Sequence, residues 1–203
     1  MRILLAAATP FELKEPPAGV QTVITGVGLV AATYHLQKAI TEKRPDLVIQ
    51  AGIAGCFDPL YALGSVIAVS EEVIADLGVE ENGSFKNLAD LSLAKDDGRL
   101  PNPYAAKLTD LPSGRSVSVN EITTRPNRIS WYKERYDPLV ESMEGAALHY
   151  VCIQENIPFL QLRAISNYIG ERDKSHWRIG LALDNLNAAL KTLLTHSLKN
   201  ASL

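Results

Sequence analysis

Residues 20–55 decide the fold, and they read VQTVITGVGLVAATYHLQKAITEKRPDLVIQAGIAG. The apolar runs at 20–25 and 47–51 are short, and each ends at a glycine, as buried strands do. Between them, residues 29–43 place apolar side chains at helical spacing, and a proline follows that segment. The stretch therefore predicts a strand, a helix and a second strand, which is the unit of an α/β sheet.

The same alternation extends outward over the whole chain, residues 1–203, which we expect to form one domain. Residues 81–114 are polar and predict a long excursion with little regular structure. Further strands are expected at 3–8, 64–75, 115–119, 139–143 and 159–166, and further helices at 144–155 and around the leucines at 183, 186, 190, 193 and 194. This pattern favours a three-layer α/β domain.

Composition excludes several classes of function. Of the 203 residues, 46% are hydrophobic, and the net charge of −3 comes without a dense basic stretch, so nucleic acid is not an expected partner. No apolar run reaches the ~20 residues of a membrane span, and the N-terminal run is too short for a signal peptide, so we expect a cytoplasmic protein. Cys56 and Cys152 form no CxxC pair and are expected to be reduced, buried thiols.

Two glycine-rich segments follow the first two strands of residues 20–55. Gly26, Gly28 and Ala31 fit the dinucleotide pattern GxGxxA, but the next strand, LVIQAG, ends without the acid that would hold a ribose, which disfavours NAD. A second glycine turn is expected at 52–55. The two turns either share a ligand crevice at the carboxyl ends of the strands or are purely structural.

The remaining catalytic motifs are few. No HExxH, GxSxG or P-loop pattern occurs, and neither a metal nor an organic cofactor is expected. The run SMEGAA at 142–147 places Glu144 where a helix should begin. This carboxylate either complements the helix N-terminus or serves a ligand.

An ordered series of motifs resembles the purine nucleoside phosphorylase and nucleosidase family. The series covers most of the chain: Glu12 after the first strand, ITGVGLVAAT at 24–33, QAGIAGCF at 50–57, GSVIAVSEEVIADLG at 64–78, SVSVNEIT at 116–123, SMEGAALHYVC at 142–152 and RAISNYIG at 163–170. The resemblance implies an α/β/α sandwich with a mixed central sheet. It also implies a small nucleoside as substrate and a homo-oligomer in which a neighbour closes part of the pocket.

The resemblance also implies roles for individual residues. Met143 and Glu144 match the pair that holds the ribose, and Ser166 and Asn167 match the site beside N7 of the purine. Ala54 and Gly55 fall beside the ribose and the nucleophile. The base pocket is expected at Asn120, Glu121, Ile122 and Thr123.

Three departures from the family's phosphorylases favour water over phosphate as the nucleophile. In the bacterial phosphorylases of the family, two arginines and a serine bind the phosphate. The equivalent positions in this chain are Glu12, Gln50 and Ile53. Glu12 would repel an anion and instead matches the carboxylate with which nucleosidases activate water. The sequence therefore predicts hydrolysis of an N-glycosidic bond.

The position of Asn167 bears on which purine is released. The methylthioadenosine nucleosidases carry Asp there, which can protonate N7, whereas an amide accepts from N7–H and donates to O6 of a 6-oxopurine. Asn167, the run ADLG at 75–78 and the segment from RAISN at 163–167 to Trp177 together resemble the futalosine-hydrolysing branch of the family. This resemblance implies the release of hypoxanthine and dehypoxanthine futalosine in menaquinone biosynthesis. Asp173 or a water is then the candidate proton donor to the base. A methylthioadenosine/adenosylhomocysteine nucleosidase, a phosphorylase and a non-catalytic nucleoside-binding protein remain alternatives.

Overall fold

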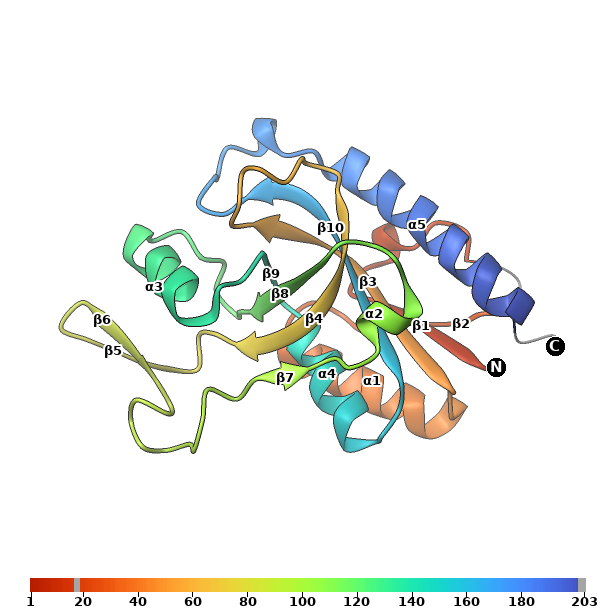
Figure 1. Cartoon of the computed structure of the whole chain (residues 1–203), viewed down its shortest axis with the longest axis horizontal. Coiled ribbons are helices and arrows are strands. Elements are labelled where there is room, and N and C mark those ends of the chain that lie inside the picture. The colour runs from red at the N-terminus through yellow and green to blue at the C-terminus, as the bar shows by residue number, and fades with distance from the viewer. Residues whose placement is uncertain (17–18, 201–203) are drawn as a thin grey trace.

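A computed structural model describes residues 1–16 and 19–200 (Figure 1). Its central sheet is mixed, and strands β3 and β10 pair within it, so that β3, β10, β4, β8 and β9 close into a ring extended by β1 and β2. The strands are β1 (Ile3–Ala7), β2 (Gln21–Ile24), β3 (Leu47–Cys56), β4 (Val66–Ile74), β7 (Leu100–Pro101), β8 (Ser113–Ser118), β9 (Val140–Ser142) and β10 (Phe159–Tyr168). The predicted mixed sheet is confirmed, whereas its closure into a ring was not predicted from the sequence.

Helices cover both faces of the sheet, which confirms the three layers (Figure 1). α5 (Ile179–Asn200) and the short α2 (Ala105–Leu108) lie on one face, and α1 (Leu29–Lys43) and α4 (Gly145–Gln154) lie on the other. Neighbouring residues of β1 point to opposite layers, because Leu5 packs with the α5 side and Leu4 with α1 and α4. Burying each such leucine stabilises the fold by roughly 1.5–3 kcal/mol.

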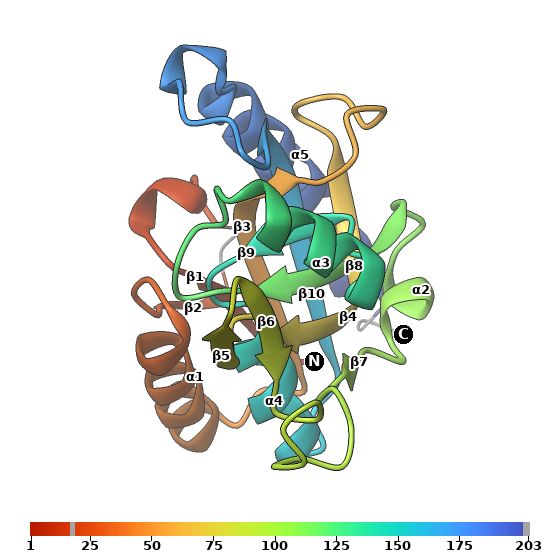
Figure 2. The ribbon, with the colours of Figure 1, turned by 90° about the vertical axis from the view of Figure 1, so that its left-hand side faces the viewer.

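The polar excursion starts as a hairpin, which the sequence analysis did not predict. β5 (Gly78–Glu81) pairs with β6 (Ser84–Asn87), and the hairpin projects from the sheet in Figure 1. The overlooked signal is Asn82-Gly83, because both residues have the positive φ of a two-residue hairpin turn. The hairpin is tied to α3 (Pro126–Tyr136), whose Arg128 pairs with Glu80 at 2.7 Å. α3 in turn packs on β4 and β8 (Figure 2).

The predicted glycine turn at 52–55 is wrong, because β3 continues through it to Cys56. These glycines serve close packing above the strand. A Cβ at Gly52 would overlap the guanidinium of Arg163, and a Cβ at Gly55 would lie 3.3 Å from Nδ2 of Asn167. β10 likewise runs two residues further than predicted, so Asn167 belongs to the strand. Both differences bring polar side chains to the carboxyl ends of neighbouring strands.

Two further findings concern the same described residues. Cys56 and Cys152 are free and buried, as predicted. None of the helices in residues 1–16 and 19–200 has both the length and the apolar character needed to cross a membrane.

His149 of α4 makes stability depend on pH. Its side chain is fully buried, its Nδ1 lies 2.8 Å from the carbonyl oxygen of Leu100, and burial lowers its pKa to about 4. The unfolded chain binds this proton near pH 6.5, so the contribution of His149 to the unfolding free energy is lost as pH falls from 6.5 towards 4. We expect a loss of up to about 3 kcal/mol from this group.

Denaturant unfolding of the wild type and of His149→Gln at pH 7 and pH 4.5 measures that loss. Buried Glu72 and Glu141, whose pKa values burial raises, act in the opposite direction in both proteins, so the difference between the two profiles isolates His149. Parallel profiles would contradict the expectation.

Candidate active site

A cavity of about 210 Å³ lies at the carboxyl ends of β1, β3 and β10, beside the start of α4. Open α/β sheets bind ligands in this position. Its lining consists of Ala8, Thr9, Glu12, Val27, Ile53, Ala54, Gly55, Ile122, Glu141, Ser142, Met143, Glu144, Ser166, Asn167, Ile169 and Trp177. Eight residues predicted to serve the site are among them: Glu12, Ala54, Gly55, Ile122, Met143, Glu144, Ser166 and Asn167.

A larger groove of about 510 Å³ lies elsewhere, between the segment after β3 and the end of α3. Its lining includes Asp58, Arg115 and Lys133 but none of the residues predicted from the sequence. The smaller cavity is the candidate site because it gathers buried carboxylates and an amide at the carboxyl ends of neighbouring strands.

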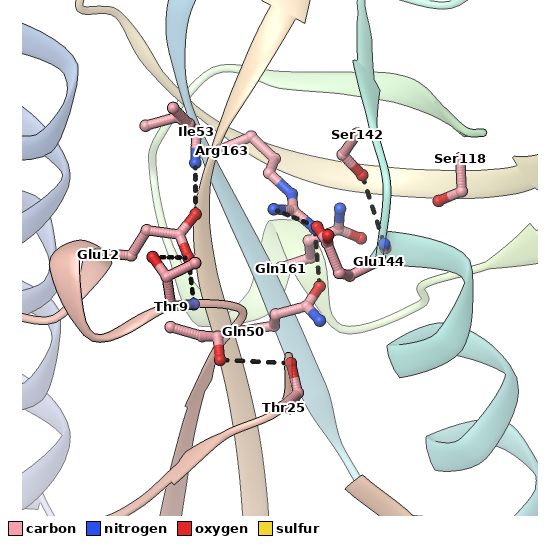
Figure 3. Close-up of polar contacts among 12 residues, drawn as sticks. Thr9, Glu12, Thr25, Gln50, Ile53, Ser118, Ser142, Glu144, Gln161 and Arg163 are labelled. Atoms are coloured by element: carbon pink, nitrogen blue, oxygen red, sulfur yellow. Dashed lines mark hydrogen bonds and ion pairs between the residues drawn. The ribbon is translucent and has the colours of Figure 1, made fainter. Parts of the chain in front are cut away.

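Glu12 is fixed at the rim of the cavity by its neighbours. It ends the short helical turn η1 (Pro10–Glu12), and only 7% of it is exposed. Its Oε2 accepts from the backbone N–H of Thr9 at 2.9 Å, and its Oε1 accepts from the N–H of Ile53 at 3.3 Å (Figure 3). The hydroxyl of Thr9 also donates to Oε2, at 3.3 Å. Since an ionised carboxylate has about four acceptor positions, one position remains, on Oε1, to bind and orient a water.

Glu144 is the N-cap residue of α4, yet its side chain makes no capping bond there. Its Oε1 instead accepts from the N–H of Gly28 at 3.1 Å, and its Oε2 lies 3.7 Å from Nη1 of Arg163. Gly28, at the start of α1, has a φ of 91°, which favours glycine. The turn at Gly26–Gly28 therefore binds the carboxylate of Glu144. The alternative interpretation, in which Glu144 only complements the N-terminus of its own helix, does not agree with these contacts.

Arg163 is a functional candidate that the sequence analysis missed. It is 1% exposed within β10, and its Nη2 donates to Oε1 of Gln50 at 3.0 Å (Figure 3). The guanidinium therefore joins Gln50 to Glu144 and lies beside Gly52, whose hypothetical Cβ would also come 3.0 Å from Oε1 of Glu12. The signal was available, because an arginine inside an apolar strand needs a buried partner.

Asn167 presents an amide to the cavity from the end of β10. Its Nδ2 donates to the carbonyl of Tyr168 at 3.2 Å, which leaves the second N–H of this amide group for a ligand. The hydroxyl of Ser166 lies 2.8 Å from Oδ1 of Asn167 and 3.2 Å from the carbonyl oxygen of Ala54, and it donates to one of them at a time. The amide is thereby held at the cavity wall.

Glu141 is a second residue that the sequence analysis missed. It lies in the middle of β9, is 6% exposed, and lines the cavity. Its Oε1 accepts from the N–H of Thr123 at 3.0 Å, and burial raises the pKa of its carboxyl. An acid in a short strand between apolar neighbours was the available signal.

Four predicted residues do not line this cavity. Glu121 and Thr123 border a small neighbouring pocket that shares Ile122 with it, and the backbone N–H of Asn120 donates to Asp76 at 2.5 Å. Asp173 lies on an exposed turn, where its carboxylate accepts from the N–H of Ser175 at 2.9 Å, and this contact lowers its pKa. The structure therefore does not bring Asp173, proposed as proton donor, to the others.

The described residues were considered as possible metal ligands. Within residues 1–16 and 19–200, no group of three or more histidines, cysteines or acids is arranged to bind an ion. The cavity is lined by three carboxylates, Glu12, Glu141 and Glu144, and by the amide of Asn167, while Arg163 contacts Glu144 from outside the lining. Carboxylates in these positions disfavour a phosphate ion bound beside them.

Comparison with known proteins gives the context of this site. A family model described as phosphorylase superfamily matches residues 18–199. The futalosine hydrolase of Streptomyces coelicolor is 34% identical over 186 residues, which cover 87% of this chain and 79% of the relative. A 5′-methylthioadenosine/S-adenosylhomocysteine nucleosidase of Tolumonas auensis is 26% identical over 200 residues, covering 87% of this chain and 82% of the relative.

One solved structure extends the likeness to the fold. The native futalosine hydrolase of Helicobacter pylori superposes with a TM-score of 0.78, covering 96% of this chain and 97% of the other, at 14% identity. The shared fold includes the strands whose carboxyl ends surround the cavity.

Proposed function

Because the chain belongs to the phosphorylase superfamily, we propose that it is an N-glycosyl hydrolase that cleaves futalosine between its purine and its sugar. The observation that carries this proposal is the convergence of Glu12, Glu144 and Asn167 on one cavity. The relative at 34% identity, named as a futalosine hydrolase, supports the choice of substrate.

The cleavage proceeds by stretching the C1′–N9 bond, so that the sugar becomes oxocarbenium-like while the bonding electrons move into the purine. Glu144 accepts hydrogen bonds from the ribose hydroxyls, and these bonds strengthen as the sugar becomes positive. Its own charge is held in place by the N–H of Gly28 and by Arg163. Met143, the adjacent residue, packs against the sugar in this arrangement.

Glu12 orients a water towards C1′ and removes its proton as the new C–O bond forms. Phosphate would meet Glu12 and Glu144 instead of cations, and the guanidinium of Arg163 is not free to bind it, because Gln50 and Glu144 already contact it. Water is therefore the nucleophile that the charges of the cavity favour.

Asn167 stabilises the leaving purine by accepting from N7–H and donating to O6, which suits hypoxanthine. A methylthioadenosine or adenosylhomocysteine nucleosidase is the second candidate, supported by the 26% identical relative. Asn167 stands against it, since an amide cannot protonate N7 of adenine. A water delivers the proton in our proposal, because Asp173 is turned away on the surface.

Three broader proposals accompany this assignment. The resemblance places the reaction, with hypoxanthine and dehypoxanthine futalosine as products, in menaquinone biosynthesis. The free thiols of Cys56 and Cys152 support a reducing compartment such as the cytoplasm. The exposed apolar side chains of Val27, Val30 and Tyr34, next to the cavity wall, support a homo-oligomer whose neighbour covers that side.

Release of free base from a panel of nucleosides tests the proposed function. We expect kcat/KM to be highest for futalosine, lower for inosine, and lowest for methylthioadenosine and adenosylhomocysteine. Preference for methylthioadenosine would establish the second candidate. Tight binding of futalosine without release of base would instead identify a binding protein.

A further inference from the structure

Glu12, the proposed base, lies on a turn whose own hydrogen bonds are long. Within η1, the backbone N–H of Glu12 reaches the carbonyl oxygen of Thr9 at 3.3 Å. The N–H of Leu13 reaches the carbonyl oxygen of Pro10 at 3.4 Å. Both distances exceed the roughly 2.7–3.2 Å of ordinary N–H···O bonds. A single short turn closed by such bonds is held in place mainly by its contacts with neighbouring elements.

The hydrogen bonds of the Glu12 carboxylate supply part of that support. Oε2 accepts from the backbone N–H and the hydroxyl of Thr9, which belongs to the same segment and moves with it. It is Oε1 that reaches the sheet, where the N–H of Ile53 in β3 donates at 3.3 Å (Figure 3). The distance from the carboxylate to a sugar held between β3 and α4 therefore depends on how η1 is anchored.

Asn187 of α5 bonds to the backbone on both sides of Leu13. Its Oδ1 accepts from the N–H of Lys14 at 2.7 Å, and its Nδ2 donates to the carbonyl oxygen of Glu12 at 3.1 Å. Nδ2 also donates to the carbonyl oxygen of Leu183, one turn earlier in α5, at 2.8 Å. The orientation of the amide is fixed, because two carbonyl oxygens require its NH₂ group and one N–H requires its oxygen.

The helix that carries this amide is itself fixed on the sheet. Ala182, Leu186 and Leu190 of α5 are buried in the core cluster beneath it. Asn187 is half-buried, next to Leu186, and its three bonds to backbone groups leave the side chain little freedom to move. The bond to the carbonyl of Glu12 therefore ties the residue that carries the carboxylate to the most firmly packed helix on this face.

We propose that Asn187 is a positioning residue for the hydrolysis, which holds the backbone of Glu12 so that the carboxylate stays within reach of C1′ and the attacking water. The inference rests on the proposed function, because it assumes that Glu12 is the base. It gives the last helix a part in the reaction, although the lining residues of the cavity end with Trp177, before α5 begins.

Asn187→Ala removes all three bonds of the amide. We expect kcat for futalosine to fall about 10–100-fold, because a misplacement of about 1 Å can cost a reaction that much. Kd for futalosine should change little, because the residues that line the cavity are the same. Single-turnover release of hypoxanthine gives the first quantity and calorimetry gives the second. A kcat equal to that of the wild type would overturn the inference.

Asn187→Asp is a second variant, with a side chain of the same size. Its carboxylate still accepts from the N–H of Lys14 but cannot donate to the carbonyl oxygens of Glu12 and Leu183. We expect kcat to fall in this variant as well, without the space that alanine leaves beside η1. Full activity of Asn187→Asp would show that the donation to Glu12 is not needed, and would overturn the inference.

The matched control is Asn185→Ala, which removes an amide of the same type from the same helix. Nδ2 of Asn185 donates to the carbonyl oxygen of Gly64 at 2.8 Å, so it ties α5 to the segment before β4 and not to η1. We expect a lower Tm in both alanine variants but a loss of kcat only in Asn187→Ala. An equal loss of kcat in both would mean general damage to α5 and would overturn the inference.

Combining Asn187→Ala with Glu12→Gln shows whether Asn187 acts through Glu12. We expect Asn187→Ala to cost little further kcat in that background, because no carboxylate remains there to be positioned. The same fold-loss in both backgrounds would leave Asn187 a structural role and overturn the inference. A wild-type kcat for Glu12→Gln alone would overturn the proposed base. A low kcat for Glu12→Gln beside a wild-type kcat for Asn187→Ala would overturn the inference only.

Discussion

Glu12→Gln is expected to lower kcat for futalosine by about 10²–10⁴-fold, the range of general-base assistance, while Kd for the nucleoside changes little. The amide keeps the size of the side chain and can still accept from the N–H of Thr9, but it cannot take a proton from water. Single-turnover release of hypoxanthine gives the chemical step, and calorimetry with futalosine gives the affinity.

Glu15→Gln is the matched control, because Glu15 is an exposed acid three residues further along the chain. Its turnover is expected to equal that of the wild type. Unchanged turnover in Glu12→Gln would remove Glu12 from the mechanism and assign the activation of water to another group.

Glu144→Gln is expected to lower kcat/KM by about 10²–10³-fold, because a charge that stabilises the cationic sugar is lost. The neutral amide also leaves the guanidinium of Arg163 buried without its charged partner, so a lower Tm should accompany the change. Glu155→Gln, at the exposed far end of α4, provides the control.

A substrate without sugar hydroxyls separates the ribose contact from general damage. With 2′,3′-dideoxyinosine, the wild type should already have lost the contact, so Glu144→Gln should cost much less than it does with inosine. An equal cost with both substrates would mean that Glu144 acts on the fold and not on the ribose.

The sequence predicted the layers because its apolar periodicities are strong. Residues 29–43 were expected to be helical and form α1 with the same bounds, and the continuous apolar runs became the inner strands. The prediction of a turn at 52–55 was wrong for a physical reason. Glycine favours turns, but here Gly52 and Gly55 give room to side chains that arrive from β10, more than 100 residues later in the chain.

Only the site residues that lie within the family motifs could be predicted from the sequence. Glu12, Glu144 and Asn167 were assigned from local motifs, and the fold brings all three to one cavity. Arg163 and Glu141 were missed, because their partners, Gln50 and the backbone of Thr123, are distant in sequence. A single sequence shows that a charge in an apolar strand needs a partner, but it does not show which residue the sheet places beside it.

The central claim is that water, and not phosphate, attacks the sugar. The most direct measurement is the rate of hypoxanthine release from futalosine in phosphate-free buffer and in buffer with added phosphate, with the sugar product examined by phosphorus NMR. We predict equal rates and no sugar 1-phosphate, because the cavity offers carboxylates where a phosphate would need cations. Release that requires phosphate and yields a sugar 1-phosphate would contradict the account.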